Sequence, residues 1–107
     1  MPVLAPVLAA LALAAAPRLP YPAPRLLQPT EKTKCDMGEV LVIEPAKGEL
    51  KMKTPAGIVT YKAGPDVQVF DKDGKPVGSI STLAPGQKAR VYYVVDDGAR
   101  AGEIDLE

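Results

Sequence analysis

The sequence predicts an all-β fold, a small antiparallel barrel of five to seven strands or a compact sandwich, behind an apolar leader and a proline-rich linker. Two observations from Met37 onward lead to this prediction. Short runs of β-branched and aromatic residues alternate with glycine and proline turns, which is the pattern of all-β domains. No stretch shows a sustained 3.6-residue period, so we expect at most one helical turn, near residues 81–84.

Seven apolar segments are the predicted strands, and some of them are expected to be halves of one bent strand. The clearest is 88–95, where a period of two separates a core face from an outward face. The core set is Ala89, Val91, Tyr93 and Val95, and the outward set is Lys88, Arg90, Tyr92 and Val94. The seven segments are 38–44, 49–53, 58–62, 67–71, 77–83, 88–95 and 100–106.

Turns with defined chemistry separate these segments. Residues 55–57 and 84–86 each contain a proline, which presets φ, and a glycine, which accepts positive φ. Asp-Gly pairs at 73–74 and 97–98 are typical of hairpins between antiparallel neighbours. An open sheet of this size would leave long edges and an uncovered face. We therefore expect the strands to close into a barrel.

The order of short motifs resembles a known class of domains. Gly-Glu-Val at 38–40 opens a first strand and Gly-Glu-Leu-Lys-Met at 48–52 returns from it. Residues 83–91 enter a late strand and 101–104 lie in the last one. This order is similar to that of small exported bacterial OB-like β-barrel domains of unknown function. The resemblance implies a partly open five-stranded barrel in the cell envelope, and it supplies no catalytic residues.

The N-terminal third reads as a leader followed by a linker. Residues 3–16 are almost purely apolar, a length that fits a signal-peptide core and falls short of the ~18 residues that span a bilayer. We expect a signal peptide at 1–16, cut after Ala14 or, as second choice, Ala16, which leaves no stable membrane span. No lysine or arginine precedes the run, so a structural N-terminal helix stays open as the alternative.

The chain after the leader divides into a linker and a domain. Five prolines between Pro17 and Pro29 fix φ and remove backbone donors, which predicts an extended spacer over 17–36. The β-barrel domain is then expected at 37–107.

Composition argues against several classes of function. Lysine plus arginine equals aspartate plus glutamate at 13 each, so no positive excess is available for a nucleic-acid backbone. Histidine is absent, which removes the usual general base and the commonest zinc ligand. We therefore expect no nucleic-acid partner, no cofactor and no enzymatic activity.

One group of sulfur-bearing residues is a candidate metal site. Cys35, Met37 and Met52 would bind a cuprous ion if the segment before the first strand folds back across the second. Met52 also alternates with Leu50, as a core residue would. The Asp-Lys-Asp-Gly sequence at 71–74 resembles the opening of a calcium loop but lacks its closing carboxylate, and we interpret it as a hairpin turn.

One group of aromatic and basic residues is a candidate interaction patch. Tyr92, flanked by Arg90, is the aromatic expected to face outward, and Tyr61 is expected beside them. The paired carboxylates Asp96 and Asp97 lie in a predicted turn, where adjacent side chains point apart, and no acid–base role is expected for them.

These features favour an exported, non-catalytic binding module of the bacterial envelope, periplasmic or secreted, whose partner is a protein or another envelope component. The alternative is a periplasmic copper accessory protein that uses the three sulfur residues. Cys35 is the only cysteine. We expect it to be partly exposed, with an ordinary pKa of about 8.5, and to form a disulfide-linked dimer or a mixed disulfide in an oxidising compartment.

Overall fold

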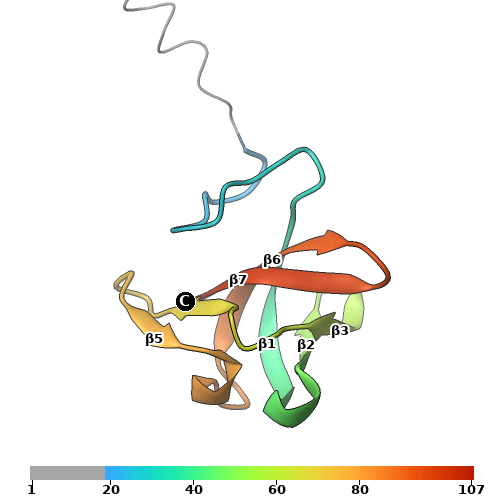
Figure 1. Cartoon of the computed structure of the whole chain (residues 1–107), viewed down its shortest axis with the longest axis vertical. Coiled ribbons are helices and arrows are strands. Elements are labelled where there is room, and N and C mark those ends of the chain that lie inside the picture. The colour runs from blue at the N-terminus through green and yellow to red at the C-terminus, as the bar shows by residue number, and fades with distance from the viewer. Residues whose placement is uncertain (1–18) are drawn as a thin grey trace, which may run out of the picture.

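The computed structural model describes residues 19–107, and the regular elements there are strands and two short 3₁₀ turns (Figure 1). The all-β prediction is confirmed, and one of the 3₁₀ turns overlaps the predicted helical turn at 81–84. Among these residues no helix is long and apolar enough to cross a membrane. The elements are β1 (Lys34–Glu44), η1 (Pro45–Lys47), β2 (Glu49–Thr54), β3 (Gly57–Lys62), β4 (Gln68–Phe70), β5 (Pro76–Gly78), η2 (Ile80–Thr82), β6 (Lys88–Val95) and β7 (Ala99–Leu106).

Five of the strands close into a barrel. Their order is β3-β2-β1-β6-β7, and β7 returns to β3 through a parallel pairing of Tyr61 with Ala99 and Lys62 with Arg100. Counted along the chain, this is the order 1-2-3-5-4-1 expected of an OB-like barrel. The predicted small OB-like barrel is confirmed, and among its five strands this closing pair is the parallel one. Five strands cannot each run opposite to both neighbours, so closing the ring requires one parallel pair.

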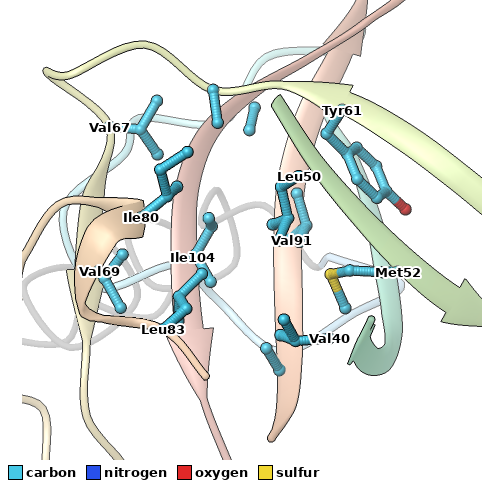
Figure 2. Close-up of a cluster of buried hydrophobic side chains, with 13 residues drawn as sticks. Val40, Leu50, Met52, Tyr61, Val67, Val69, Ile80, Leu83, Val91 and Ile104 are labelled. Carbon is cyan, nitrogen blue, oxygen red and sulfur yellow. The ribbon is translucent and has the colours of Figure 1, made fainter. Parts of the chain in front are cut away.

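The segment between β3 and β6 adds two short strands. β4 runs parallel to β7 beyond the point where β3 ends, and β5 pairs antiparallel with β4. The predicted strand 77–83 is instead β5 followed by η2. This segment supplies Val67, Val69, Ile80 and Leu83 to the core (Figure 2).

The core lies inside the barrel and follows the alternation of the strands. Val91 and Ile104 face each other across β6 and β7 with no exposed surface. Leu50 and Tyr61 do the same across β2 and β3. Figure 2 shows these side chains converging between the strands. Val95, predicted as core, is 63% exposed because it lies at the hairpin end of β6, next to the turn that leads to β7.

β1 begins earlier than the sequence indicates. It starts at Lys34, four residues before the predicted strand, because residues 34–37 pair with residues 90–93 of β6. Residues 34–36, assigned to the linker, are therefore part of the barrel. A register irregularity between Val40 and Val42 interrupts the pairing of β1 with β2.

Residues 19–33, which we call the strap, form no strand and pass over the barrel beside β6 and β7 (Figure 1). The strap was expected to be a plain spacer, but it makes defined hydrogen bonds to the barrel wall. The leader at 1–16 lies outside the described residues, so its expected cleavage remains a prediction.

Candidate functional site

The three residues of the predicted interaction patch occupy different environments. Tyr61 is fully buried inside the barrel. Tyr92 does face away from the core, but it has no exposed surface because the strap covers it. Arg90 is mostly buried and lies 3.6 Å from Asp105. The prediction that Tyr92 is exposed is therefore wrong, and the three side chains do not form an open surface.

The three predicted copper ligands also lie apart. Cys35 and Met37 pair with Tyr92 and Arg90 on the outer face of the wall, the face that points away from the core. Met52 is fully buried on the inner face, in the hydrophobic core. The structure does not bring the three sulfur atoms to one point. Among residues 19–107 no group of three or more His, Cys, Asp or Glu side chains is placed to hold a metal ion.

A polar cluster lies at the inner face of β1. The carboxylate of Asp36 accepts hydrogen bonds from the hydroxyl groups of Tyr61 and Tyr93, the latter at 3.1 Å. The two tyrosine rings pack edge to face with their centroids 5.3 Å apart. Burial, helped by the Asp36 charge, raises the pKa of Tyr61 well above its usual value and that of Tyr93 to about 12. Both hydroxyls therefore stay protonated at neutral pH and hold Asp36 in place.

The most specific polar contact is between the strap and Glu103 of β7. The backbone N–H groups of Arg25, Leu26 and Leu27 all donate to the Glu103 carboxylate, at 2.6, 2.7 and 2.7 Å. Glu103 is only 1% exposed. Hydrogen bonds to a charged group are about twice as strong as neutral ones. The Glu103 carboxylate is therefore positioned to accept hydrogen bonds from consecutive backbone N–H groups of an extended segment.

A β-bulge creates the geometry for this contact. The pairing of β6 with β7 slips between Tyr92 and Tyr93, so Gly102 is an extra residue next to Glu103. A Cβ at Gly102 would lie 3.2 Å from Leu27 Cδ1, tighter than an ordinary contact. Glycine here lets the strap approach the wall closely enough for its amides to reach Glu103.

Tyr92 supplies a second polar contact to the strap. Its hydroxyl donates to the backbone carbonyl of Pro22 at 2.6 Å, and its ring packs edge to face on Tyr21 at 5.7 Å. Burial raises the pKa of Tyr92 to about 12, so the hydroxyl remains a donor at neutral pH. Glu103 and Tyr92 are directly paired across β7 and β6. One acceptor and one donor thus contact the main chain of the strap.

Asp105 lies two residues beyond Glu103 on the same face of β7. It has no exposed surface, and as a carboxylate neither of its oxygens has a hydrogen-bond partner among the described residues. Burial first, then the hydrogen bond and charge of Glu103, raise the pKa of Asp105 to about 7. Burial opposes ionisation of Glu103 too, but hydrogen bonds from protonated Asp105 and from the strap amides hold its pKa below the usual value. The pair therefore shares one proton below neutrality.

Cys35 is next to this region and is less reactive than its sequence context indicates. It is half-buried and is directly paired with Tyr92. Burial raises its pKa to about 11, and the charge of Arg90 lowers it only in part. The expected pKa of about 8.5 is therefore wrong. Cys35 is a free thiol in this structure, and the disulfide-linked dimer stays a prediction.

Two cavities flank the strap. One, of about 220 Å³, lies between Leu27, Tyr93 and Arg100, and the other, of about 380 Å³, lies between Tyr21, Cys35 and Pro55. Ligand pockets are typically about 300–1,000 Å³ and enclose most of the ligand surface. Both cavities are bounded in part by the strap, so the shape of each depends on where the strap lies.

Fold and site together define an OB-like barrel whose outer face over β6 and β7 is covered by the chain's own proline-rich segment. Comparisons with known proteins identify nothing similar: no protein-family model, no curated protein and no solved structure matches this chain.

Glu103 and Asp105 were not among the site residues predicted from the sequence. In the sequence Gly-Glu-Ile-Asp-Leu they alternate with Ile104, which is the ordinary pattern of a solvent-exposed face. Alternation distinguishes the two faces of a strand but does not show that a remote segment covers the outer one. The available signal was Gly102, since a glycine inside a strand often marks a bulge or a close backbone approach.

Proposed function

We propose that the protein is an exported, non-catalytic binding module, periplasmic or secreted, that holds an extended polypeptide segment on the outer face of β6 and β7. The observation that carries the proposal is the Glu103 carboxylate, which accepts three consecutive backbone N–H groups. Such an acceptor recognises main chain rather than a particular side chain. In the isolated chain the strap fills this site, and a partner segment would take its place.

The composition of the strap supports recognition of extended chain. Pro20, Pro22, Pro24 and Pro29 lie on either side of the three bonded amides and restrict the backbone to extended conformations. A segment restricted in this way loses less conformational entropy on binding than a flexible one. The Pro22 carbonyl, bound by Tyr92, is the matching acceptor. We therefore infer that the partner class is a proline-containing segment with two or three consecutive free amides.

The buried carboxyl pair supports a binding role over a catalytic one. A general acid or base must come within hydrogen-bond reach of its substrate. Glu103 is already occupied by strap amides, and Asp105 has no exposed surface. In this arrangement Glu103 binds the strap amides and Asp105 contacts Glu103, so neither carboxyl group is free to contact a substrate.

Proline substitutions in the strap test the binding site directly. In the full-length chain, Leu26→Pro with Leu27→Pro removes two of the three amide donors and should release the strap while leaving Glu103 and Tyr92 intact. A fluorescent peptide with the sequence of residues 19–33 should then bind this variant at least tenfold more tightly than wild type, because the internal competitor is gone. Fluorescence anisotropy measures the affinity.

Two controls make the peptide experiment specific. Leu26→Ala with Leu27→Ala keeps the amide donors, so its affinity for the peptide should stay close to that of wild type. Adding Glu103→Gln to the proline variant should weaken binding by about thirtyfold, because glutamine keeps one acceptor oxygen but loses the charge. If the proline variant binds the peptide no better than wild type, or if Glu103→Gln leaves the binding intact, the proposed site is refuted.

Export is tested separately from binding. The apolar run at 3–16 supports a signal peptide. A reporter that is active only outside the cytoplasm, fused after Glu107 and expressed in bacteria, should be active, and the purified product should begin at Ala15 or Pro17. An inactive reporter on an uncleaved chain would contradict export.

A further inference from the structure

The two carboxyl groups beneath the strap lie side by side on β7, so the charge of one affects the protonation of the other. Glu103 and Asp105 project from the same face of β7 with Ile104 between them on the opposite, core face. Both are 1% exposed or less. Glu103 holds the strap amides, whereas Asp105 has no hydrogen-bond partner within residues 19–107 unless it is protonated and donates to Glu103.

The charged and titratable groups around the pair come from every neighbouring element. β6 contributes Arg90, at 3.6 Å from Asp105, and Tyr92, which is directly paired with Glu103. β1 contributes the Cys35 thiol, and the strap contributes Arg25. Beyond β7, Glu107 draws on the same Arg90 at 3.7 Å, so this guanidinium is shared between two acidic residues. From β4, the neighbour of Asp105 is Phe70, which is apolar.

We propose that the strap is a pH-sensitive latch, in which one proton shared by Glu103 and Asp105 sets how tightly residues 19–33 cover the β6–β7 face. With the proton bound to Asp105, this carboxyl donates to Glu103, and Glu103 keeps its negative charge for the strap amides. Without it, two adjacent buried carboxylates repel each other, and the Arg90 guanidinium beside Asp105 is shared with Glu107. Lifting the strap brings water to both charges and relieves the repulsion. The released proton goes to solvent.

The direction of the effect follows from the two protonation shifts. In the closed state burial and Glu103 raise the pKa of Asp105 to about 7, and this shift is lost when the strap opens. The closed state therefore binds more protons than the open one between about pH 4 and pH 7, and closure weakens as pH rises through that window. For Glu103 the closed-state pKa is lowered, so closure also weakens when acid protonates it. The strap is therefore held most tightly at the acidic end of that window, at about pH 4.

This latch rests on the proposed function only for its biological purpose, the opening of the binding face to a partner. It predicts that the strap leaves the binding face uncovered more often above neutrality than at pH 5, and that a partner segment bound in its place is held through the same proton. The latch itself is a property of the isolated chain and needs no partner to be measured.

Hydrogen exchange of the strap amides tests the latch. In the full-length protein, NMR gives the protection of the Leu26 and Leu27 amides, which is the intrinsic exchange rate divided by the observed rate at the same pH. The resulting protection should fall by about tenfold per pH unit at the steepest, and by at least tenfold in total from pH 5 to pH 7.5. In Asp105→Asn, whose amide donates to Glu103 at every pH, protection should vary less than threefold over this range. Glu39→Gln, an exposed carboxyl on β1, should behave as wild type.

A second measurement keeps the test decisive if Asp105→Asn does not fold. The carboxyl ¹³C resonance of Asp105 in the wild-type protein should titrate with the same midpoint as the strap protection. Constant protection between pH 5 and pH 7.5, pH-dependent protection retained in Asp105→Asn, or a different midpoint for Asp105 would each overturn the latch. Peptide binding by the proline variant without any pH dependence would refute the latch and leave the proposed function standing. If strap protection depends on pH as described but the proline variant binds no peptide, the latch stands and the proposed function is refuted.

Discussion

At the scale of single residues, Glu103 decides whether the strap is part of the folded domain. Burying a carboxylate costs several kcal/mol unless hydrogen bonds compensate it. Here three backbone amides do so, and those amides belong to a segment with no secondary structure of its own. The contact therefore stabilises the carboxylate and the strap at the same time.

We predict that Glu103→Gln lowers the free energy of unfolding by about 2 kcal/mol. Glutamine keeps one acceptor oxygen but loses the charge that strengthens all three hydrogen bonds. Urea denaturation of the full-length protein at pH 7 measures the change. Glu39→Gln, an exposed carboxylate on β1, is the matched control and should shift stability by less than about 0.5 kcal/mol. Equal effects of the two substitutions would contradict the assigned role.

A second residue-scale prediction concerns the hydroxyl of Tyr61. Tyr61→Phe removes a fully buried donor to Asp36 and should cost about 1–2 kcal/mol. Tyr93→Phe should cost less, because Tyr93 is only half-buried and its hydrogen bond to Asp36 is longer, at 3.1 Å. Thermal unfolding of both variants ranks them. The opposite ranking would show that Asp36 depends mainly on Tyr93.

At the scale of elements, β1 connects the barrel to the strap. It pairs with β2 through its second half and with β6 through its first half, so one long strand belongs to two parts of the wall. The two pairings overlap near Gly38, where the chain passes very close to β2. Closure of the five-stranded barrel depends on this change of partner along β1, from β6 to β2.

Gly38→Ala is predicted to be the most destabilising small substitution in the barrel wall. An added Cβ would lie 2.2 Å from the Lys53 carbonyl oxygen, a backbone atom that cannot move aside without breaking the pairing. We expect a loss of about 3 kcal/mol or more. Gly64→Ala is the control, because its Cβ would meet only the Asp66 side chain, at 3.6 Å. It should leave stability unchanged or raise it by about 0.5 kcal/mol. Chemical denaturation would contradict the account if both variants matched wild type.

Strand positions could be predicted from the sequence where local pattern alone decides them. β6 matches the predicted segment 88–95, because alternation and flanking turns define both of its ends. β1 and the 77–83 segment were predicted less well. The start of β1 depends on its pairing with β6. Residues 80–82 form η2, which places Ile80 in the core. These outcomes depend on contacts distant in sequence, which a local pattern does not contain.

At the scale of the whole molecule, the candidate site was not predictable from local pattern. Tyr92 was correctly placed on the outer face, but its burial depends on the strap 70 residues earlier in the chain. The sequence predicts a spacer at the strap because its prolines exclude regular hydrogen-bonded structure. A segment without secondary structure can still dock when its free amides find a buried acceptor. That acceptor, Glu103, is recognisable only in three dimensions.

The stability of the whole molecule should depend on pH through Asp105. Its raised folded-state pKa, about 7, means that the folded protein binds more protons than the unfolded chain between about pH 4 and pH 7. The free energy of unfolding should therefore fall as pH rises through this window, by up to about 1.4 kcal/mol per pH unit at the steepest, and level off above pH 7. Asp105→Asn should remove this decline. Urea titrations at pH 5, 6, 7 and 8 measure it, and a rise in stability from pH 5 to pH 8 would contradict it.

Hydrogen exchange at one pH tests the central claim, that Glu103 holds the strap on the barrel, most directly. The amides of Arg25, Leu26 and Leu27 should exchange at least a hundredfold more slowly than the same amides in a free peptide of residues 19–33. In Glu103→Gln all three should lose most of that protection together, while the Val91 amide in the barrel core stays protected. Strap amides that exchange at the free-peptide rate in the wild-type protein, or that remain protected in Glu103→Gln, would contradict the account.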